Sequence, residues 1–245
     1  YDLGSSFVKI ALLDYKKNKQ VSLIKEPTSE MEIISLKDDW AEQDPELWWK
    51  YICNGTKRLL NKTKINNDQI KAIGISYQMH GLVILDDKKK LLRNSIIWCD
   101  SRAVDIGNKA EKEIEIEILR EKLLNTPGNF TVSKLKWVME NEPDLYKKIK
   151  YFMLPGDYIA YKLTGEISTT INGLSEAILW DFKSNSSADW LLDYFGINKN
   201  FIPQVVNNFE EQGRVNKKAS KESGLPFNIP LRYRAGDQPN NAFSL

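Results

Sequence analysis

The chain has 245 residues, of which 42% are hydrophobic and 28% charged, enough apolar material for one large domain or two small ones. Lys and Arg together number 35 and Asp and Glu 33, and the formal net charge of +2 excludes both a strongly basic nucleic-acid-binding surface and an acidic tail. Two cysteines exclude a disulfide framework, and one histidine excludes a multi-histidine metal site. Because the sequence shows no signal segment and no apolar run near the ~20 residues of a membrane span, the chain is predicted to be soluble and cytoplasmic, without nucleic-acid or membrane partners.

The first predicted element is a β-hairpin. Residues 8–14 (VKIALLD) are apolar and rich in strand-forming residues, residues 20–26 alternate between apolar and polar, and a polar turn separates the two segments. A glycine turn at Gly4 follows Tyr1 almost at once, although a strand usually has about 5–6 residues. We therefore expect a first strand that is cut short, with further residues upstream.

A long amphipathic helix is predicted at residues 45–61, because Asp44 can cap it, Pro45 suits its first position and apolar residues recur at helical spacing. Further strands are predicted at residues 70–76, 82–85, 95–97, 151–154 and 231–235. Further helices are predicted at residues 155–163, 187–194 and 216–223, and a last one begins within residues 238–245. The mixture predicts an α/β fold, with a mixed sheet flanked by helices.

Residues 105–124 carry conflicting signals. Residues 113–118 (EIEIEI) alternate with a period of two, which is typical of a strand, but the segment is long and contains no Gly or Pro after Gly107. We therefore predict a single helix there. Thr131 or Ser133 is expected to cap the helix that follows.

Four motifs offer chemistry, and the first is DLGSSFVK at residues 2–9. Gly4 allows a tight turn with outward N–H groups, and the hydroxyls of Ser5 and Ser6 can donate to phosphate oxygens. The Asp2 carboxylate can hold Mg²⁺ directly or through water. The alternative is an ordinary solvated turn, since Asp, Gly and Ser are common turn residues.

The second motif is Gln78-Met79-His80-Gly81, directly after a predicted strand. Loops at the carboxyl ends of strands are where open α/β sheets place ligands. An amide, an imidazole and a thioether can provide the hydrogen bonds and the apolar wall that a neutral sugar needs. The alternative is a partly buried histidine that merely completes a turn.

The third motif, Trp98-Cys99-Asp100-Ser101-Arg102, follows the predicted strand at 95–97. The indole of Trp98 can stack on a polyhydroxylated ligand while Asp100 and Arg102 form charge-assisted hydrogen bonds with it. Equally, Asp100 and Arg102 can be a pair that fixes the loop, with Asp100 capping the next helix.

The fourth motif is AGDQPNNA at residues 235–242, after the last predicted strand. Asp237 can act as a general base toward a hydroxyl, with Gln238 beside it as a candidate sugar ligand. The alternative is that Asp237 only caps the helix that begins there.

In their order along the chain, these motifs resemble the amino-terminal half of the FGGY carbohydrate kinases, and QMHG followed by WCDSR is most similar to the xylulokinase subgroup. The resemblance implies a ribonuclease H-like, actin-like ATPase domain and the transfer of phosphate from ATP, with Mg²⁺, to a ketopentose such as D-xylulose. It implies that Asp237 is the catalytic base and that Met79 and His80 bind the ketose. It also implies that Gly4, Ser5 and Ser6 bind phosphate, with Asp2 toward the metal.

The resemblance further implies a boundary near Asp237. Residues 1–235 would be the sugar-binding domain and residues 236–245 the start of an ATP-binding domain, so the chain alone is expected to be inactive. One departure is that Gln238-Pro239-Asn240-Asn241 replaces the small residues common in relatives. Three alternatives stay open, namely a kinase of ribulose or gluconate, a non-catalytic sugar-binding module, and an interaction domain in which the four motifs do not converge. A homodimer is also possible.

Overall fold

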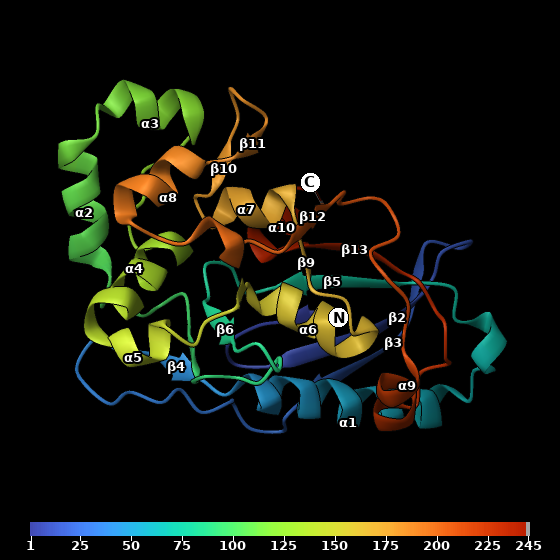
Figure 1. Ribbon diagram of the computed structural model, residues 1–245. Coiled ribbons are helices and arrows are strands. Elements are labelled where there is room, and N and C mark those ends of the chain that lie inside the picture. Colours follow the sequence, from blue (N-terminus) through green and yellow to red (C-terminus); the bar gives the residue numbers. More distant parts are fainter. Residues whose placement is uncertain (244–245) are drawn as a thin grey trace.

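The fold centres on a mixed five-stranded sheet, as seen in a computed structural model that describes residues 1–243 (Figure 1). Residues 244 and 245, where the last predicted helix was expected to continue, lie outside the described residues. The sheet has the order β13-β5-β1-β2-β3. Its strands are β1 Asp2–Leu3, β2 Val8–Asp14, β3 Lys19–Glu26, β5 Ile73–Tyr77 and β13 Leu231–Gly236. β1, β2 and β3 are antiparallel neighbours, whereas β5 pairs in parallel with both β1 and β13, which confirms the predicted hairpin and the mixed sheet.

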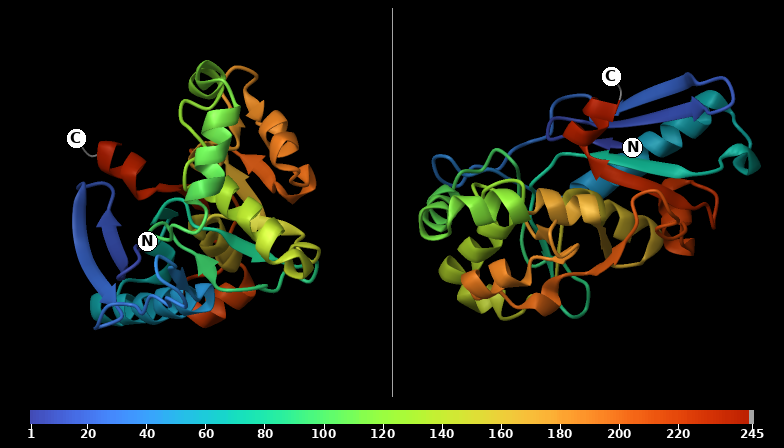
Figure 2. Two further views of the ribbon diagram at one scale, coloured as in Figure 1. Left: turned by 90° about the vertical axis from the view of Figure 1, so that its left-hand side faces the viewer. Right: turned by 90° about the horizontal axis from the view of Figure 1, so that it is seen from above.

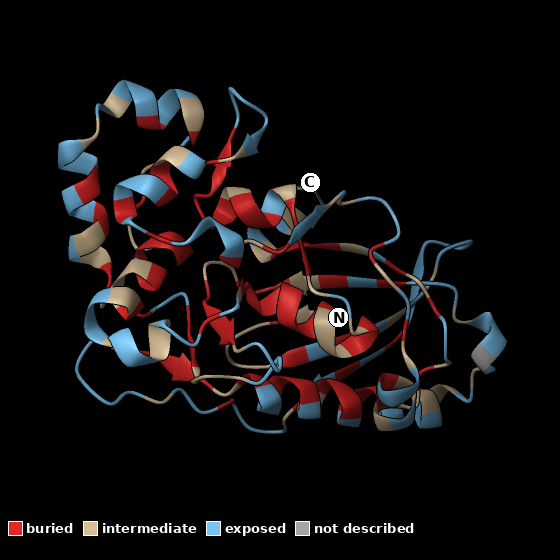
Figure 3. Cartoon of the chain, viewed as in Figure 1, coloured by how far each residue is buried: buried red, intermediate tan, exposed pale blue. Residues whose placement is uncertain are grey.

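Two long helices cover one face of this sheet. α1 (Pro45–Thr63) packs on β2 and β3, and α6 (Pro155–Thr164) packs on β5 and β13 beside it. Figure 3 shows buried residues on the sides of both helices that face the sheet. α1 begins as predicted, with the Asp44 carboxylate accepting a hydrogen bond from the Glu46 amide at 2.8 Å. Gly55 lets α1 approach the sheet closely, since a Cβ there would lie 2.4 Å from Ile10 Cδ1.

The remaining elements form a helical region at one side of the sheet (Figure 1). Its helices are α2 Val104–Glu113, α3 Ile116–Lys122, α4 Thr131–Asn141, α5 Pro143–Tyr146, α7 Ile171–Glu176 and α8 Asp189–Phe195. The short strands pair two by two, and they are β4 Glu42–Gln43 with β7 Ser95–Ile96, β6 Val83–Leu85 with β8 Tyr151–Met153, β9 Ser168–Thr170 with β12 Gln204–Val206, and β10 Trp180–Asp181 with β11 Ser186–Ser187. α9 (Lys217–Ser223) lies against α1 and α6. No helix of the described residues is both long and apolar enough to cross a membrane.

The prediction of one helix over residues 105–124 was wrong. The backbone becomes extended at Ile114 and Glu115, between α2 and α3, and both Ile114 and Ile116 pack against the core. The period-two alternation of this segment therefore marked a real break. The predicted cap of α4 was also wrong: Phe130 occupies the N-cap position without a side-chain bond, and the Ser133 hydroxyl instead donates to the Pro127 carbonyl at 3.1 Å.

The sheet brings three chain segments to one edge. β1, β5 and β13 run in parallel, with Leu3 and Gly236 both paired to Tyr77. The residues that follow each strand therefore emerge side by side. α10 (Asp237–Phe243) begins directly after β13 and leaves the sheet on the side away from α1 (Figure 2).

Candidate active site

A pocket of about 420 Å³ lies at this edge, where residues of all four motifs meet. Its walls are formed by Gly4, Ser5, Ser6, Phe7, Lys9, Gln78, Met79, His80, Trp98, Asp237 and Gln238. Each predicted phosphate, sugar or base residue of the first, second and fourth motifs is among them, and so is Trp98. Three predicted site residues do not line it, namely Asp2, Asp100 and Arg102.

The turn between β1 and β2 forms one wall. The Gly4 amide donates to the Phe7 carbonyl at 3.0 Å, which closes the turn. The Ser5 carbonyl accepts from Gln43 Nε2 at 2.7 Å, and the Trp98 indole N–H donates to the Ser5 hydroxyl at 3.3 Å. These contacts fix the shape of the turn and connect it with the third motif.

Gln43 is a site residue that the sequence analysis missed. Its Oε1 accepts from Gln78 Nε2 at 3.2 Å and from the Trp48 indole at 3.1 Å, while its Nε2 holds Ser5. It thus connects the first two motifs from below the pocket. The only sequence signal near it was the predicted cap at Asp44, which concerns helix α1 rather than a ligand site.

Asp237 stands at the first position of α10. Burial, reinforced by the nearby charge of Asp2, raises its pKa above the ordinary 3.8, against the opposing effect of the Gln238 amide. Asn240 Nδ2 donates to the Gly236 carbonyl at 2.8 Å, so the unusual residues after Asp237 still allow a helix that starts at the base. Pro239 falls in the first turn, where a missing N–H costs no helical bond.

The residue before Asp237 has to be glycine. A Cβ at Gly236 would lie 2.3 Å from Met79 Cγ and 2.6 Å from Glu176 Oε2. Met79 and Glu176 therefore pack directly on the backbone that leads into Asp237.

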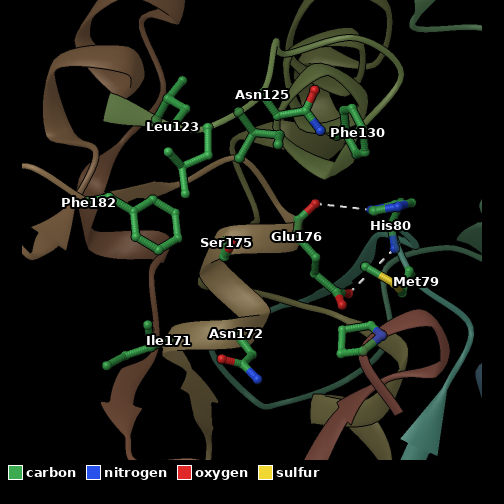
Figure 4. A pocket seen from close by; sticks show the side chains of 13 residues that line it. Met79, His80, Leu123, Asn125, Phe130, Ile171, Asn172, Ser175, Glu176 and Phe182 are labelled. Atoms are coloured by element: carbon green, nitrogen blue, oxygen red, sulfur yellow. Dashed lines mark hydrogen bonds between the residues drawn. The ribbon is translucent and has the colours of Figure 1, made fainter. Parts of the chain in front are cut away.

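His80 is held by contacts at several of its atoms. Its φ of 60° lies in the left-handed region, its carbonyl accepts from Lys134 Nζ at 2.8 Å, and its ring Nδ1 lies 3.0 Å from the Glu176 carbonyl oxygen (Figure 4). The Phe130 ring meets it edge-on, with centroids 4.5 Å apart. Burial, with help from the charge of Lys134, lowers the pKa of His80 to about 4 despite its bond to Glu176. The imidazole is therefore neutral at pH 7.

Asp100 and Arg102 form a buried pair instead of reaching the pocket. The Asp100 carboxylate accepts from the Ala41 amide at 2.6 Å and from Arg102 Nε at 2.9 Å. The Arg102 guanidinium also stacks on Trp40, 3.8 Å from the ring centroid. The structure thus gives these two residues the loop-fixing arrangement and corrects the expectation that they reach a ligand. Trp98, by contrast, is 52% exposed in the pocket wall.

Asp2 lies beside the pocket, paired with Lys9 Nζ at 2.9 Å. Among the described residues no group of three or more His, Cys, Asp or Glu side chains could hold a metal ion. Mg²⁺ in nucleotide sites commonly keeps several waters and takes only one or two protein carboxylates beside the phosphate oxygens. Asp2, at the edge of the pocket and close enough to Asp237 for its charge to raise the pKa of that carboxyl, fits that limited role.

A second pocket of about 370 Å³ adjoins the first on the other side of Met79 and His80. Figure 4 shows His80 and Glu176 on its wall, with Phe130, Asn125 and Asn172 around it. Its lining is mostly apolar, with a few amide and hydroxyl groups.

The sheet order, the covering helices and the pocket at the strand ends define a ribonuclease H-like domain of the actin-like ATPase class. The solved structure of xylulose kinase from Rhodospirillum rubrum matches it with a TM-score of 0.90 and 25% identity, over 99% of this chain and 49% of that one. The model of the FGGY family of carbohydrate kinases, N-terminal domain, matches residues 1–244, and the chain belongs to this family.

Individual relatives match most of this chain, but the match covers only half or less of their own length. Xylulose kinase from Staphylococcus xylosus is 30% identical over 242 residues, which are 98% of this chain and 48% of that protein. Glycerol kinase from Thermococcus onnurineus is 31% identical over 204 residues, 81% of this chain and 40% of that protein. The chain thus spans about half the length of the xylulose kinases that it matches.

Proposed function

We propose that the chain is the sugar-binding half of an ATP-dependent kinase that phosphorylates a ketopentose, D-xylulose to D-xylulose 5-phosphate. The observation that carries this proposal is the convergence of Asp237, His80 and the Ser5-Ser6 turn on one pocket. An interaction domain that uses these residues only as turns and caps has no need to bring them together. The xylulose kinases among its relatives support the choice of sugar.

In this proposal Asp237 is the general base. Phosphoryl transfer needs mainly positioning and electrostatic stabilisation. Asp237 would accept the proton of the terminal hydroxyl as that oxygen attacks the γ-phosphate, and its raised pKa makes it a stronger base than an ordinary aspartate. The backbone and hydroxyl groups of Gly4, Ser5 and Ser6 would face the phosphate oxygens on the adjoining wall.

The sugar would lie between Trp98 and the second motif. The exposed indole offers a stacking surface, Met79 an apolar wall, and His80 and Gln238 hydrogen bonds to hydroxyl groups. Gln78 is buried, and its Oε1 has no hydrogen-bond partner in the structure. Since a buried amide oxygen without a partner is costly, it is available to a sugar hydroxyl or to water.

ATP and Mg²⁺ are the proposed cofactors. Bound Mg²⁺ would neutralise phosphate charge, with Asp2 as the carboxylate on this side and Asp237 left free to accept the proton. We propose that residues 1–235 form the sugar-binding domain and that an ATP-binding domain begins at residue 236. The double length of the relatives supports a second domain, whereas the N-terminal family model extends past this boundary, over residues 1–244. This half alone is then expected to be inactive. Cytoplasmic location and a homodimer stay predictions.

The test is a sugar panel with the full-length protein. ADP release would be followed with D-xylulose, D-ribulose, D-gluconate and glycerol, the last because a glycerol kinase is also a relative. The proposal expects the highest kcat/KM with D-xylulose. A higher kcat/KM with ribulose or gluconate would indicate a kinase of that other sugar in the same family. Tight sugar binding with no ADP release for any sugar would favour a non-catalytic module.

A further inference from the structure

His80 adopts a backbone conformation that needs support. Non-glycine residues rarely take a positive φ, and the loop reaches 60° at His80, two residues after the buried Gln78. Three neighbouring groups hold it there: Lys134 Nζ bonds its carbonyl at 2.8 Å, Glu176 Oε1 lies 3.4 Å from its amide, and the Glu176 carbonyl meets its ring. Strain of this kind persists where surrounding contacts over-determine it, which is common at ligand sites.

The contact with the Glu176 carbonyl decides which ring nitrogen carries the proton. A carbonyl oxygen can only accept a hydrogen bond, so Nδ1, 3.0 Å away, has to be the N–H of the neutral ring. The lone pair is then on Nε2. Glu176 is the last residue of α7, and its carbonyl is free for this bond because the last carbonyls of a helix have no partner in the next turn.

The two supporting side chains come from different helices. Lys134 lies on α4 and is completely buried, with its charge supported by Asp100 nearby. Glu176 lies on α7, is also buried, and packs against the backbone of Gly236. The titratable groups around the ring are thus Lys134 and Glu176, with Asp237 across the same pocket, and burial raises the pKa of the Glu176 carboxyl well above its usual value. Both supports act from behind the loop rather than from the pocket wall that faces the phosphate turn.

We propose that Glu176 and Lys134 are positioning residues that hold His80 as a single tautomer, protonated on Nδ1, so that Nε2 is a fixed hydrogen-bond acceptor for the sugar. The proposal rests on the proposed sugar site and adds a rule of recognition to it. The substrate group that meets His80 has to be a donor, which a hydroxyl can be and a ketone or carboxylate oxygen cannot. A site that fixes direction in this way rejects an analogue without the donor, because Nε2 would then be left unpaired.

The direct test is nitrogen NMR of the imidazole. His80 is the single histidine of the 245-residue chain, and in the full-length protein the loss of signals in His80→Gln identifies it. With ¹⁵N-labelled histidine, we expect a protonated Nδ1 and an unprotonated Nε2 at neutral pH, with titration near pH 4. A protonated Nε2 or an even mixture of tautomers in the neutral ring would overturn the proposal.

Matched variants test the two supports. Glu176→Gln keeps an acceptor for the His80 amide and is expected to preserve the tautomer and the KM for sugar. Glu176→Leu keeps the backbone carbonyl but, like Lys134→Met, removes a side-chain support of the His80 backbone, so the ring can move away from that carbonyl. Both variants are therefore expected to give mixed tautomers and to raise KM about tenfold with kcat within about twofold, the effect of one weakened hydrogen bond. Lys136→Met is the control, since Lys136 lies on the same helix but pairs with Glu140 at the surface. Unchanged tautomer and KM in both Glu176→Leu and Lys134→Met would contradict the assignment.

This result is separable from the proposed function. The NMR measurement needs neither sugar nor ATP, so a fixed Nδ1–H tautomer in a protein that phosphorylates no sugar would reject the proposed function alone. Active phosphorylation by a protein whose His80 shows mixed tautomers would reject the present inference alone.

Discussion

Gly236 pairs directly with Tyr77 in the parallel register of β13 and β5. Asp237 follows β13 and Gln78 follows β5, so the two residues leave the sheet as neighbours although they are far apart in the chain. The register places the candidate base beside the candidate sugar loop. Because both strands are fixed in the core, this geometry does not depend on a flexible segment.

The close packing at Gly236 gives the first prediction. Gly236→Ala would push its new methyl group into Met79 and Glu176, and the start of α10 would have to move. We expect a loss of about 1–3 kcal/mol in the free energy of unfolding, as for other overpacked sites, and a large fall in kcat of the full-length protein. Gly74→Ala on β5 is the control, because its nearest neighbour would be 3.9 Å away. Equal effects of the two substitutions would refute the argument.

The lowered pKa of His80 predicts a pH dependence of stability. The pKa falls from 6.5 in the unfolded chain to about 4 in the folded one, so between these values only the unfolded state binds the proton. The contribution of His80 to the free energy of unfolding, about 3 kcal/mol, is then fully present above pH 6.5 and is lost as the pH falls toward 4. Urea denaturation of wild type and His80→Gln across this window measures the effect. Parallel curves for the two proteins would show that His80 contributes none of it.

The third motif separates into a structural and a surface part. Asp100→Ala would leave buried Arg102 with Glu42 as its remaining carboxylate partner and the Ala41 amide without its acceptor, and we expect about 3–5 kcal/mol of destabilisation. Trp98→Ala removes a half-exposed ring and should change stability by less than about 0.5 kcal/mol while raising the KM for sugar. Thermal unfolding and sugar kinetics on both variants check this division. A stable Asp100→Ala protein with a raised KM would instead return Asp100 to the sugar site.

Much of the fold follows from local patterns. The hairpin, the helix capped by Asp44 and the strand before Gln78 have clear periodicity and ends, and the structure contains each of them. The break between α2 and α3 was lost because length was given more weight than the alternation around Ile114, which reflects burial against the core. Short strands such as β9 and β12 are held by each other across distant parts of the chain and leave little local signal.

The candidate site divides in a similar way. Residues that follow strands, such as His80 and Asp237, could be predicted from their position after apolar runs. Gln43 and Glu176 could not, because each acts through one or two bonds to residues remote in sequence. The sequence also could not decide whether Asp100 and Arg102 fix the loop or bind a ligand, because the burial of the pair depends on Trp40 and Ala41 from another segment.

The central claim is that Asp237 is the base of a sugar kinase. The most direct measurement is ADP release by the full-length protein with D-xylulose, compared with Asp237→Asn under the same conditions. We predict that turnover falls by about 10²–10⁴-fold in the variant, while sugar binding stays within a few-fold of wild type, because only the proton acceptor is lost. Turnover equal to that of wild type would contradict the claim, and so would wild-type protein that releases no ADP with D-xylulose or any other sugar.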